Sequence, residues 1–359
     1  MTVVLTGPLA QPQLMQALDL RGHDVTLTGS LHGGSWAGLQ RDGWPVWIDD
    51  GGRLPGIAVT PSLQMLRYAA VMGLQIRDVG GHQVMGIAGQ GDTDQPWHAD
   101  TDRDRLNAEI ARQIMAAGDH VDPDLLAWRL PMIGIWASTR IRAGRMPISG
   151  QGVVAQRSAD AVRTLERHQR FHGYFAVEER SLTHDLHQGG TSARVTREGF
   201  LMGDAVVMLP WDPVRDRVLI IEQFRFAPYI RGDRQPWQLE PIAGRVDAGE
   251  TVESAILREA REEAALDITT LLPCFNCYPS PGAVCEFLYQ FIGVADLPDD
   301  VTGVHGLDTE AEDIRSHVMD RARLSDLVDQ GQITNGPLLT LSLWLDARAD
   351  RFKAELARR

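Results

Sequence analysis

The stretch GRVDAGETVESAILREAREEAALDI, residues 244–268, decides what kind of domain this chain contains. Thr251 is a good helix N-cap, and Glu253 in the first turn suits the positive end of the helix dipole, so a helix is predicted to begin near Thr251. At about 100° per residue, Glu259 and Glu263 fall on the apolar stripe of this helix. Two carboxylates therefore lie on the side that the helix is expected to turn toward protein.

A pair of buried carboxylates requires compensation. Burying a carboxylate is costly unless it is paired or protonated, and two carboxylates at i,i+4 spacing also repel each other. A divalent cation removes both penalties, because hard oxygen ligands suit Mg²⁺ or Mn²⁺. The alternative, on the pattern alone, is a solvated helix face with i,i+4 ion pairs.

The whole stretch resembles the Nudix box, G-x5-E-x7-R-E-U-x-E-E-x-G-U, in which U is an apolar residue. The positions in register are Gly244, Glu250, Arg258, Glu259, Ala260, Glu262, Glu263 and Leu266. Ala265 stands where the family has glycine, a residue that ends a helix at positive φ. We expect Ala265 to alter the helix end slightly, at a modest cost, without loss of metal binding.

The resemblance implies a Mg²⁺ site, with Mn²⁺ as a possible replacement. Its ligands are expected to be Glu259, Glu263 and the backbone oxygen of Ala243, with Glu312 as a further ligand from an acidic loop. Glu310, in the same loop, is expected to orient or deprotonate the attacking water. The resemblance thus places Glu310 among the catalytic residues together with Glu263.

Three further roles follow from the resemblance to the box. Glu262 is expected to support the metal shell and belongs to the catalytic set. Arg258 is expected to pair with Glu250 and brace the loop against the helix. Gly244 is expected to let the backbone approach the metal site, because glycine carries no side chain.

The flanks of the box resemble the ADP-ribose pyrophosphatase branch of the family, from about residue 171 to 345. The similar segments are DPVRDRVLIIEQFRF, PWQLEPIAG, YPSPGAVCE and HGLDTEAEDIRSHV. The resemblance implies hydrolysis of ADP-ribose to AMP and ribose 5-phosphate. Two alternatives stay open: another nucleoside diphosphate sugar, such as ADP-glucose or GDP-mannose, and a non-catalytic module that senses such nucleotides. The complete glutamate set favours an enzyme over a sensor.

The same resemblance implies substrate contacts outside the box. Arg225 is expected to bind the diphosphate or its ribose, and Glu240 a sugar hydroxyl. Arg197 is expected to reach the nucleotide pocket from the partner subunit of a homodimer that exchanges the β-segment 171–203, and Phe175 to stack on adenine. The alternatives are an Arg225 that merely snorkels and a Glu240 that pairs with a neighbouring arginine. The implied substrate-binding residues are Arg225, Arg197, Glu240, Phe175, Ser280 and Gly282.

The pattern along the chain predicts three parts. Residues 1–95 are expected to form a small α+β domain, in which WPVWIDDGG and RLPGIAVT are strands separated by glycines. Residues 96–165 are expected to form a helical connector and linker. Residues 166–359 are expected to form an α/β domain, the α/β/α sandwich with a mixed sheet that the Nudix resemblance implies.

The first part resembles the γ-glutamylcyclotransferase-like fold over residues 1 to about 85. The opening loop of that family reads Leu5-Thr6-Gly7-Pro8-Leu9 here, and no glutamate occurs before Glu109. Without a carboxylate as acid or base the domain is expected to be inactive, with Asp78 as the remaining stand-in. The combination of the two domains resembles a bacterial subgroup associated with tellurite resistance.

The composition narrows the classes of partner. The formal net charge of −13, from 35 basic and 48 acidic residues, argues against nucleic acid or an anionic membrane. Neither a membrane-spanning run nor a signal peptide is predicted, and three cysteines fit a reducing cytoplasm. CFNC, at 274–277, is expected to lie in a strand and to serve packing rather than metal or redox chemistry.

Overall fold

The computed structural model of the chain describes residues 2–91, 93–147, 157–299, 301–306 and 313–358. The packing of the backbone divides the chain into two compact units. The first unit is Met1–Met202 with Asp247–Gly249, and the second is Gly203–Val246 with Glu250–Arg359. This division differs from the three predicted parts, because the helices of the predicted connector and the strands that follow them belong to the first unit.

The first unit is built on a five-stranded sheet in the order β2-β3-β1-β5-β4. In it, β1 pairs antiparallel with β3 and parallel with β5. Its strands are β1 (Val3–Thr6), β2 (Gly22–His32), β3 (Val46–Val59), β4 (Arg77–Val79) and β5 (His82–Met85).

The prediction of two strands between residues 44 and 60 is wrong, because β3 runs through the glycine pair. Thr28 pairs with Arg53 and Ser30 with Ile48, so that residues 49–52 bulge out of β3 opposite Gly29. A bulge of this kind lets a strand continue on both sides of the extra residues.

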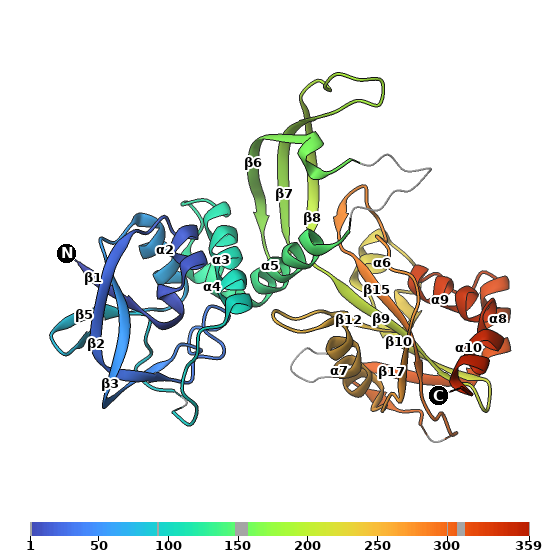
Figure 1. Cartoon of the computed structure of the whole chain (residues 1–359). Helices are drawn as coiled ribbons and strands as arrows, with labels where there is room; N and C mark the ends of the chain where they lie inside the picture. Colours follow the sequence, from blue (N-terminus) through green and yellow to red (C-terminus); the bar gives the residue numbers. More distant parts are fainter. Residues whose placement is uncertain (1, 92, 148–156, 300, 307–312, 359) are drawn as a thin grey trace. The chain divides into compact units, whose positions relative to one another are not determined.

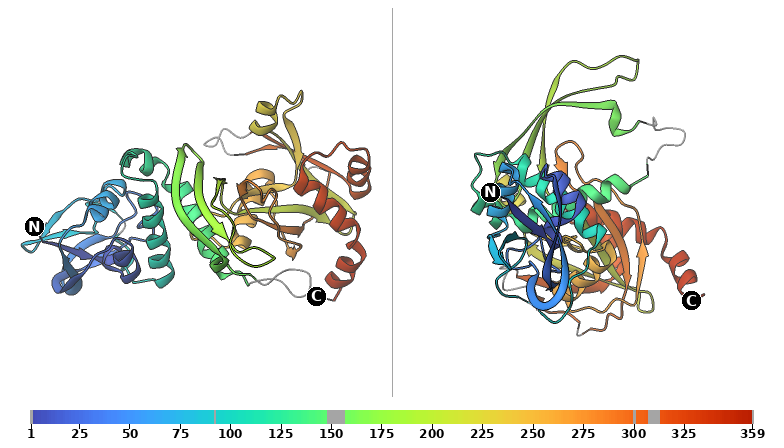
Figure 2. Two further views of the ribbon diagram at one scale, coloured as in Figure 1. Left: turned by 90° about the horizontal axis from the view of Figure 1, so that it is seen from above. Right: turned by 60° about the vertical axis from the view of Figure 1, so that its left-hand side comes forward.

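The helices of the predicted connector pack into the core of the first unit. Leu106, Ile110 and Ile114, the apolar positions at fourfold spacing, lie in one buried cluster with Leu5 and Leu14 of the preceding domain. Helix α3 lies beside the five-stranded sheet (Figures 1 and 2). The helical elements are η1 (Gly7–Ala10), α1 (Pro12–Ala17), α2 (Leu63–Val71), α3 (Thr101–Ala116), α4 (Pro123–Trp128), α5 (Leu130–Arg145) and η2 (Ala159–Ala161).

Three long antiparallel strands complete the first unit: β6 (Val162–His172), β7 (Ala176–His184) and β8 (Val195–Leu201). β7 pairs antiparallel with both β6 and β8. On β7, buried Glu178 accepts hydrogen bonds from Arg167 and Arg180, so its charge is compensated within these strands.

The second unit is built on a mixed sheet in the order β13-β15-β9-β10-β17-β16, with β11 paired to β10 and β12 to β9. The sheet is mixed because β15 runs parallel to β9, whereas β9 and β10 form an antiparallel hairpin. Its strands are β9 (Ala205–Asp212), β10 (Arg217–Phe224), β11 (Trp237–Glu240), β12 (Ile242–Arg245), β13 (Thr270–Pro273), β15 (Leu288–Val294), β16 (Val304–His305) and β17 (Ile314–Asp320), and β14 is Val284–Cys285.

Alternating residues of β9 face two different helical layers. Val207 and Leu209 pack in one cluster with the C-terminal helices, whereas Val206 and Met208 pack with α7. Helices lie on both sides of the sheet (Figures 1 and 2), which confirms the α/β/α sandwich. The helices are α6 (Phe226–Arg231), α7 (Val252–Ala264), α8 (Arg321–Asp329), α9 (Gly336–Asp346) and α10 (Ala349–Leu356).

CFNC does not extend the preceding strand, so the predicted strand is too long. β13 ends at Pro273, and Gln290 of β15 bonds there to the side chain of Asn276 and the carbonyl oxygen of Phe275 instead of continuing a regular ladder. Burial raises the pKa of Cys274 to about 12, which opposes thiolate chemistry. Within the described ranges, every helix is too short or too polar to span a lipid bilayer.

We predict that one ion pair makes the second unit sensitive to acid. Arg321 of α8 donates to both oxygens of Asp216, at 3.0 and 2.8 Å, and these hydrogen bonds, with one from Trp211, lower the pKa of Asp216 to about 2. A lowered carboxyl pKa stabilises the fold above the usual pKa near 4, and this stabilisation is lost as the pH falls toward 2.

Asp216→Asn should therefore flatten the decline of the melting temperature between pH 4 and 2. Asparagine tolerates the positive φ of 55° at this position. Asp326→Asn, at an exposed acid of α8, is the control. Equal acid sensitivity of the Asp216→Asn variant and the wild type would contradict this account.

Candidate active site

Helix α7 begins where the sequence predicts. Thr251 is its N-cap, and its hydroxyl accepts the backbone N–H of Ser254 at 3.0 Å. The hydroxyl of Ser254 accepts the backbone N–H of Thr251 at 3.0 Å in return, which completes a capping box. This reciprocal cap fixes the first turn of the helix and therefore the direction of every later side chain.

The carboxylates of Glu259 and Glu263 point toward the sheet, as the angular pattern predicts. Glu263 is 3% exposed, and its Oε2 accepts the backbone N–H of Ala243 in β12 at 3.0 Å. The side chain of Glu259 is 12% exposed. The two carboxylates thus approach the same short strand from one face of α7.

Gly244 in β12 is required by the close approach of Glu259. A Cβ atom at this position would lie 1.8 Å from Oε1 of Glu259. Any side chain at 244 would displace that carboxylate. The glycine that the box resemblance assigns to backbone approach is therefore the residue against which Glu259 packs.

Arg258 binds three glutamates and one backbone carbonyl of the same segment. Its Nη1 donates to Glu259 at 2.8 Å and to Glu262 at 2.9 Å, and its Nη2 to Glu250 at 3.1 Å. The same Nη2 donates to the carbonyl oxygen of Arg245 at 3.1 Å. Burial acts to lower the pKa of Arg258, but the bonds to Glu250 and the charges of Glu259 and Glu250 raise it above its usual value.

The donor set of this region suits a divalent cation. Glu259 and Glu263 present hard oxygen atoms beside β12, and Gly244 leaves room for a carboxylate there. Within the described ranges, no three His, Cys, Asp or Glu side chains are grouped as metal ligands. The predicted residues Glu310 and Glu312 lie outside the described residues.

The predicted substrate residues Arg225 and Glu240 bind each other. Nη2 and Nε of Arg225 donate to Oε2 of Glu240 at 2.6 and 2.8 Å. Asn335 donates to the other oxygen of Glu240 at 3.1 Å, and Gln223 contacts Oε2 at 3.3 Å. Glu240 therefore pairs with a neighbouring arginine, which is the alternative stated for it above. The side chain of Arg225 is 41% exposed.

Glu286 is a charged residue near this pair that the sequence pattern did not single out. Burial raises its pKa, although the nearby charge of Arg245, at 3.5 Å, acts to lower it. Its only sequence signal is its place at the end of YPSPGAVCE. The predicted pocket residues Ser280 and Gly282 lie earlier in the same loop, where the carbonyl of Ser280 accepts the N–H of Val284 at 3.0 Å.

Two predicted substrate residues belong to the first unit. Arg197 lies on β8, and its Nη1 donates to the carbonyl of Thr196 at 2.8 Å. Phe175 lies between β6 and β7, with its ring 4.9 Å from Tyr174 and 5.1 Å from Phe200. The residues of α7 and β12 belong to the second unit.

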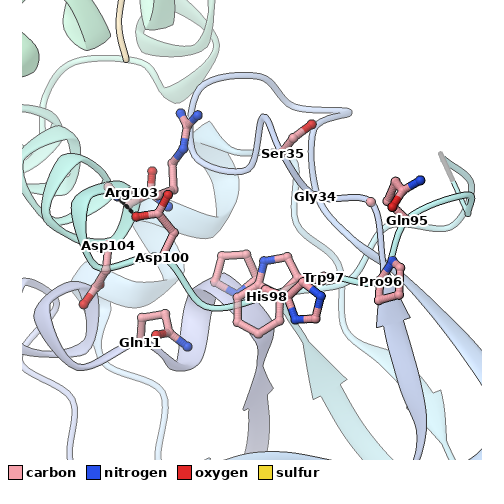
Figure 3. A pocket seen from close by; sticks show the side chains of 13 residues that line it. Gln11, Gly34, Ser35, Gln95, Pro96, Trp97, His98, Asp100, Arg103 and Asp104 are labelled. Carbon is pink, nitrogen blue, oxygen red and sulfur yellow. Dashed lines mark hydrogen bonds between the residues drawn. The ribbon is translucent and has the colours of Figure 1, made fainter. Parts of the chain in front are cut away.

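The first unit contains a pocket of about 340 Å³ of its own. Figure 3 shows Trp97 and His98 beside the first turn of α3, which carries Asp104. Asp104 accepts the backbone N–H groups of Gln13 and Leu14, at 2.9 and 3.0 Å, and so serves as a cap for α1.

Glu109, the first glutamate of the chain, and Asp78, the predicted stand-in, lie outside the residues that line this pocket. Glu109 bonds to Arg140 at 2.6 Å and to Gln113 at 2.6 Å. Asp78 accepts the N–H of Gly81 in an exposed turn. Neither residue lines the pocket.

Comparison with known proteins gives consistent similarities. A family model described as "NUDIX domain" matches residues 202–339. The chain is 38% identical over 196 residues to the ADP-ribose pyrophosphatase of Escherichia coli (strain K12), a match that covers 55% of this chain and 93% of that protein. It is 37% identical over 177 residues to the ADP-ribose pyrophosphatase of Haemophilus influenzae, covering 49% of this chain and 81% of that protein.

Two more distant similarities extend this comparison. A GDP-mannose pyrophosphatase of Salmonella choleraesuis is 31% identical over 173 residues, covering 48% of this chain and 88% of that protein. A solved structure described as an ADP compounds hydrolase is similar at a TM-score of 0.41 and 19% identity, and covers 54% of this chain and 98% of that one.

We predict that Ala265→Gly stabilises the second unit. Ala265 ends α7 at φ 51° and ψ 34°, a left-handed conformation that costs an L side chain energy and glycine nothing. The urea concentration at the midpoint of unfolding should rise, which corresponds to an increase of about 1 kcal/mol in the free energy of unfolding. The matched change one residue earlier, Ala264→Gly, lies within the helix and should destabilise by about as much. If Ala265→Gly fails to stabilise the chain, the left-handed conformation at this helix end is contradicted.

We predict that Gly244→Ala damages the carboxylate site without unfolding the chain. The added methyl group would displace Glu259, so the affinity for Mn²⁺, measured by electron paramagnetic resonance, should fall about 10-fold or more. Gly336→Ala is the control, since a Cβ there meets no atom within 4 Å. Equal Mn²⁺ affinity of the two variants would show that Glu259 is not a ligand.

Proposed function

The chain belongs to the Nudix family, and we propose on this basis that its second unit hydrolyses ADP-ribose to AMP and ribose 5-phosphate with Mg²⁺. The membership follows from 38% identity across 93% of an ADP-ribose pyrophosphatase. The observation that carries the proposal is the set of carboxylates on α7 that faces β12 and surrounds Arg258. Hydrolysis of a diphosphate requires groups that stabilise and position charge, because its transition state is stabilised largely by electrostatics and positioning.

The metal-binding part of the site is assigned to α7 and β12. Glu259, Glu263 and the backbone oxygen of Ala243 are proposed to hold the cation, with Glu312 as a further ligand. A bound divalent cation would supply neutralisation of the diphosphate and polarisation of the attacking water. Arg258 positions Glu259 and Glu262, and the hydrogen bond from the N–H of Ala243 directs Glu263 toward β12.

The remaining residues bind the substrate and the reacting water in this proposal. Glu310 is proposed to orient the water and take its proton, as the family resemblance implies. Arg225 is proposed to contact the diphosphate or its ribose, and its hydrogen bonds to Glu240 would hold the guanidinium in place. Glu240 then acts mainly by orienting Arg225.

The alternative substrate is another nucleoside diphosphate sugar. The observation that favours it is the 31% identity to a GDP-mannose pyrophosphatase. Residues outside the box set the substrate, so the box alone does not distinguish ADP-ribose from another nucleoside diphosphate sugar. A non-catalytic sensor is disfavoured because a binding module would not need Glu259, Glu262, Glu263 and Glu310 together.

The wider setting of the enzyme is part of the same proposal. We propose a cytoplasmic homodimer in which segment 171–203 exchanges and delivers Arg197 and Phe175 to the nucleotide. The first domain is proposed to be γ-glutamylcyclotransferase-like and inactive, which the occupied carboxylates Asp104 and Glu109 support. Neither nucleic acid nor a membrane is a proposed partner, and the association with tellurite resistance implies no particular reaction.

We predict that the intact chain with Mg²⁺ has its highest kcat/KM for ADP-ribose among ADP-ribose, ADP-glucose and GDP-mannose. Glu263→Gln should lower kcat about 10³-fold while the fold is retained, since it weakens charge stabilisation of the transition state. The control is Glu253→Gln, at an exposed glutamate of the same helix.

The outcomes separate the hypotheses. A preference for GDP-mannose or ADP-glucose would replace the proposed substrate and leave the site intact. Tight binding of ADP-ribose without turnover would favour the sensor. An unchanged kcat in Glu263→Gln would overturn the assignment of the metal ligands.

A further inference from the structure

Arg129 is a buried arginine without an acidic partner. It joins α4 to α5 in the first unit and is only 6% exposed. Among the residues that the structure describes, no carboxylate lies within 4 Å of its guanidinium. A buried charge without a counter-charge is strongly destabilising, so this position calls for a compensating group.

The buried glutamates of this region are committed elsewhere. Glu109 bonds to Arg112 and Arg140, and Glu178 to Arg167 and Arg180. Both carboxylates therefore already face two guanidinium groups each. Neither is available to neutralise Arg129.

The polar neighbour of Arg129 does not supply the missing charge. Nη1 of Arg129 lies 3.5 Å from Nδ1 of His172. Burial lowers the pKa of His172, and the charges of Arg129 and His120 lower it further. A neutral imidazole leaves the positive charge of Arg129 in place.

A small cavity lies against this arginine. It has a volume of about 20 Å³ and is lined by Arg129 and Trp136 together with apolar side chains that include Leu126 and Met132. Nε of Arg129 and Nε1 of Trp136 are buried, and neither has a hydrogen-bond partner in the described part of the chain. Two buried N–H donors without partners thus belong to residues that line one small cavity, whose polar lining also includes Gln113, Gln169 and Tyr174.

We propose that this cavity binds a monatomic anion, with chloride as the ligand. The space holds a particle about the size of one water molecule, which a monatomic anion matches more nearly than phosphate or a carboxylate group does. A water molecule would accept from Trp136 but would leave Arg129 uncompensated. An anion accepts from both donors and also neutralises the buried charge.

The anion would act on structure rather than on catalysis. Arg129 is the residue shared by the end of α4 and the start of α5, and Gln169 of β6 and Ala176 of β7 also line the cavity. A bound chloride would therefore connect these helices to the strands within the first unit. The residues of this site belong to the first unit, whereas the carboxylates of α7 belong to the second.

The first test locates the ion directly. Crystals of the full chain grown in sodium bromide should show an anomalous peak within hydrogen-bond distance of Arg129 and Nε1 of Trp136. A peak at that place supports the proposal. Density for a water molecule without anomalous signal, or a carboxylate seated on Arg129, would overturn it.

The second test measures the linkage between chloride and folding. The melting temperature of the full chain should rise by a few degrees, and saturate, when sodium gluconate is replaced by sodium chloride at constant ionic strength. Arg129→Met should abolish this rise. The control is Arg163→Met, at an exposed arginine of β6, which should keep it.

A third variant keeps the test decisive if Arg129→Met does not fold. Trp136→Phe retains the ring but removes the N–H donor, so half-maximal stabilisation should need about 10-fold more chloride. An unchanged chloride response in Trp136→Phe, or in Arg129→Met where that variant folds, would contradict the proposed site.

Discussion

The interaction on which the candidate site depends is the binding of three glutamates by the single guanidinium of Arg258. Glu250, Glu259 and Glu262 would otherwise repel one another across a short distance. The same side chain reaches the carbonyl of Arg245 at the end of β12. Arg258 therefore connects strand, loop and helix, and it brings the box into one conformation before any substrate arrives.

The sandwich around this arginine fixes where the carboxylates lie. Alternate residues of β9 pack against α7 on one side and against the C-terminal helices on the other, so the helix cannot rotate without exposing apolar surface. The close contact of Gly244 with Glu259 and the hydrogen bond from Ala243 to Glu263 then set the distance between helix and β12. Packing and polar contacts thus determine one arrangement of the two carboxylates.

Much of the second unit could be predicted from the sequence because its signals are local. The N-cap Thr251, the apolar stripe of α7 and the hairpin of β9 and β10 each depend on residues close together in the chain. The left-handed helix end at Ala265 is also a local feature, and alanine adopts it at some cost where the family has glycine.

The features that could not be predicted depend on residues far apart in the sequence. The pairing of Arg225 with Glu240 requires the register of β10 with β11, and Glu286 meets Arg245 only through tertiary packing. The continuity of β3 is likewise set by its partner β2 rather than by its glycines. The buried Arg129 carries no local signal at all, because burial of a charge emerges only when helices and strands assemble.

The central claim is that this chain cleaves the diphosphate of ADP-ribose, and ³¹P nuclear magnetic resonance of ADP-ribose incubated with the intact chain and Mg²⁺ tests it most directly. The account predicts that the two diphosphate signals disappear together and that two phosphomonoester signals, those of AMP and ribose 5-phosphate, replace them. Diphosphate signals that persist at full intensity, or the appearance of inorganic phosphate alone, would contradict it.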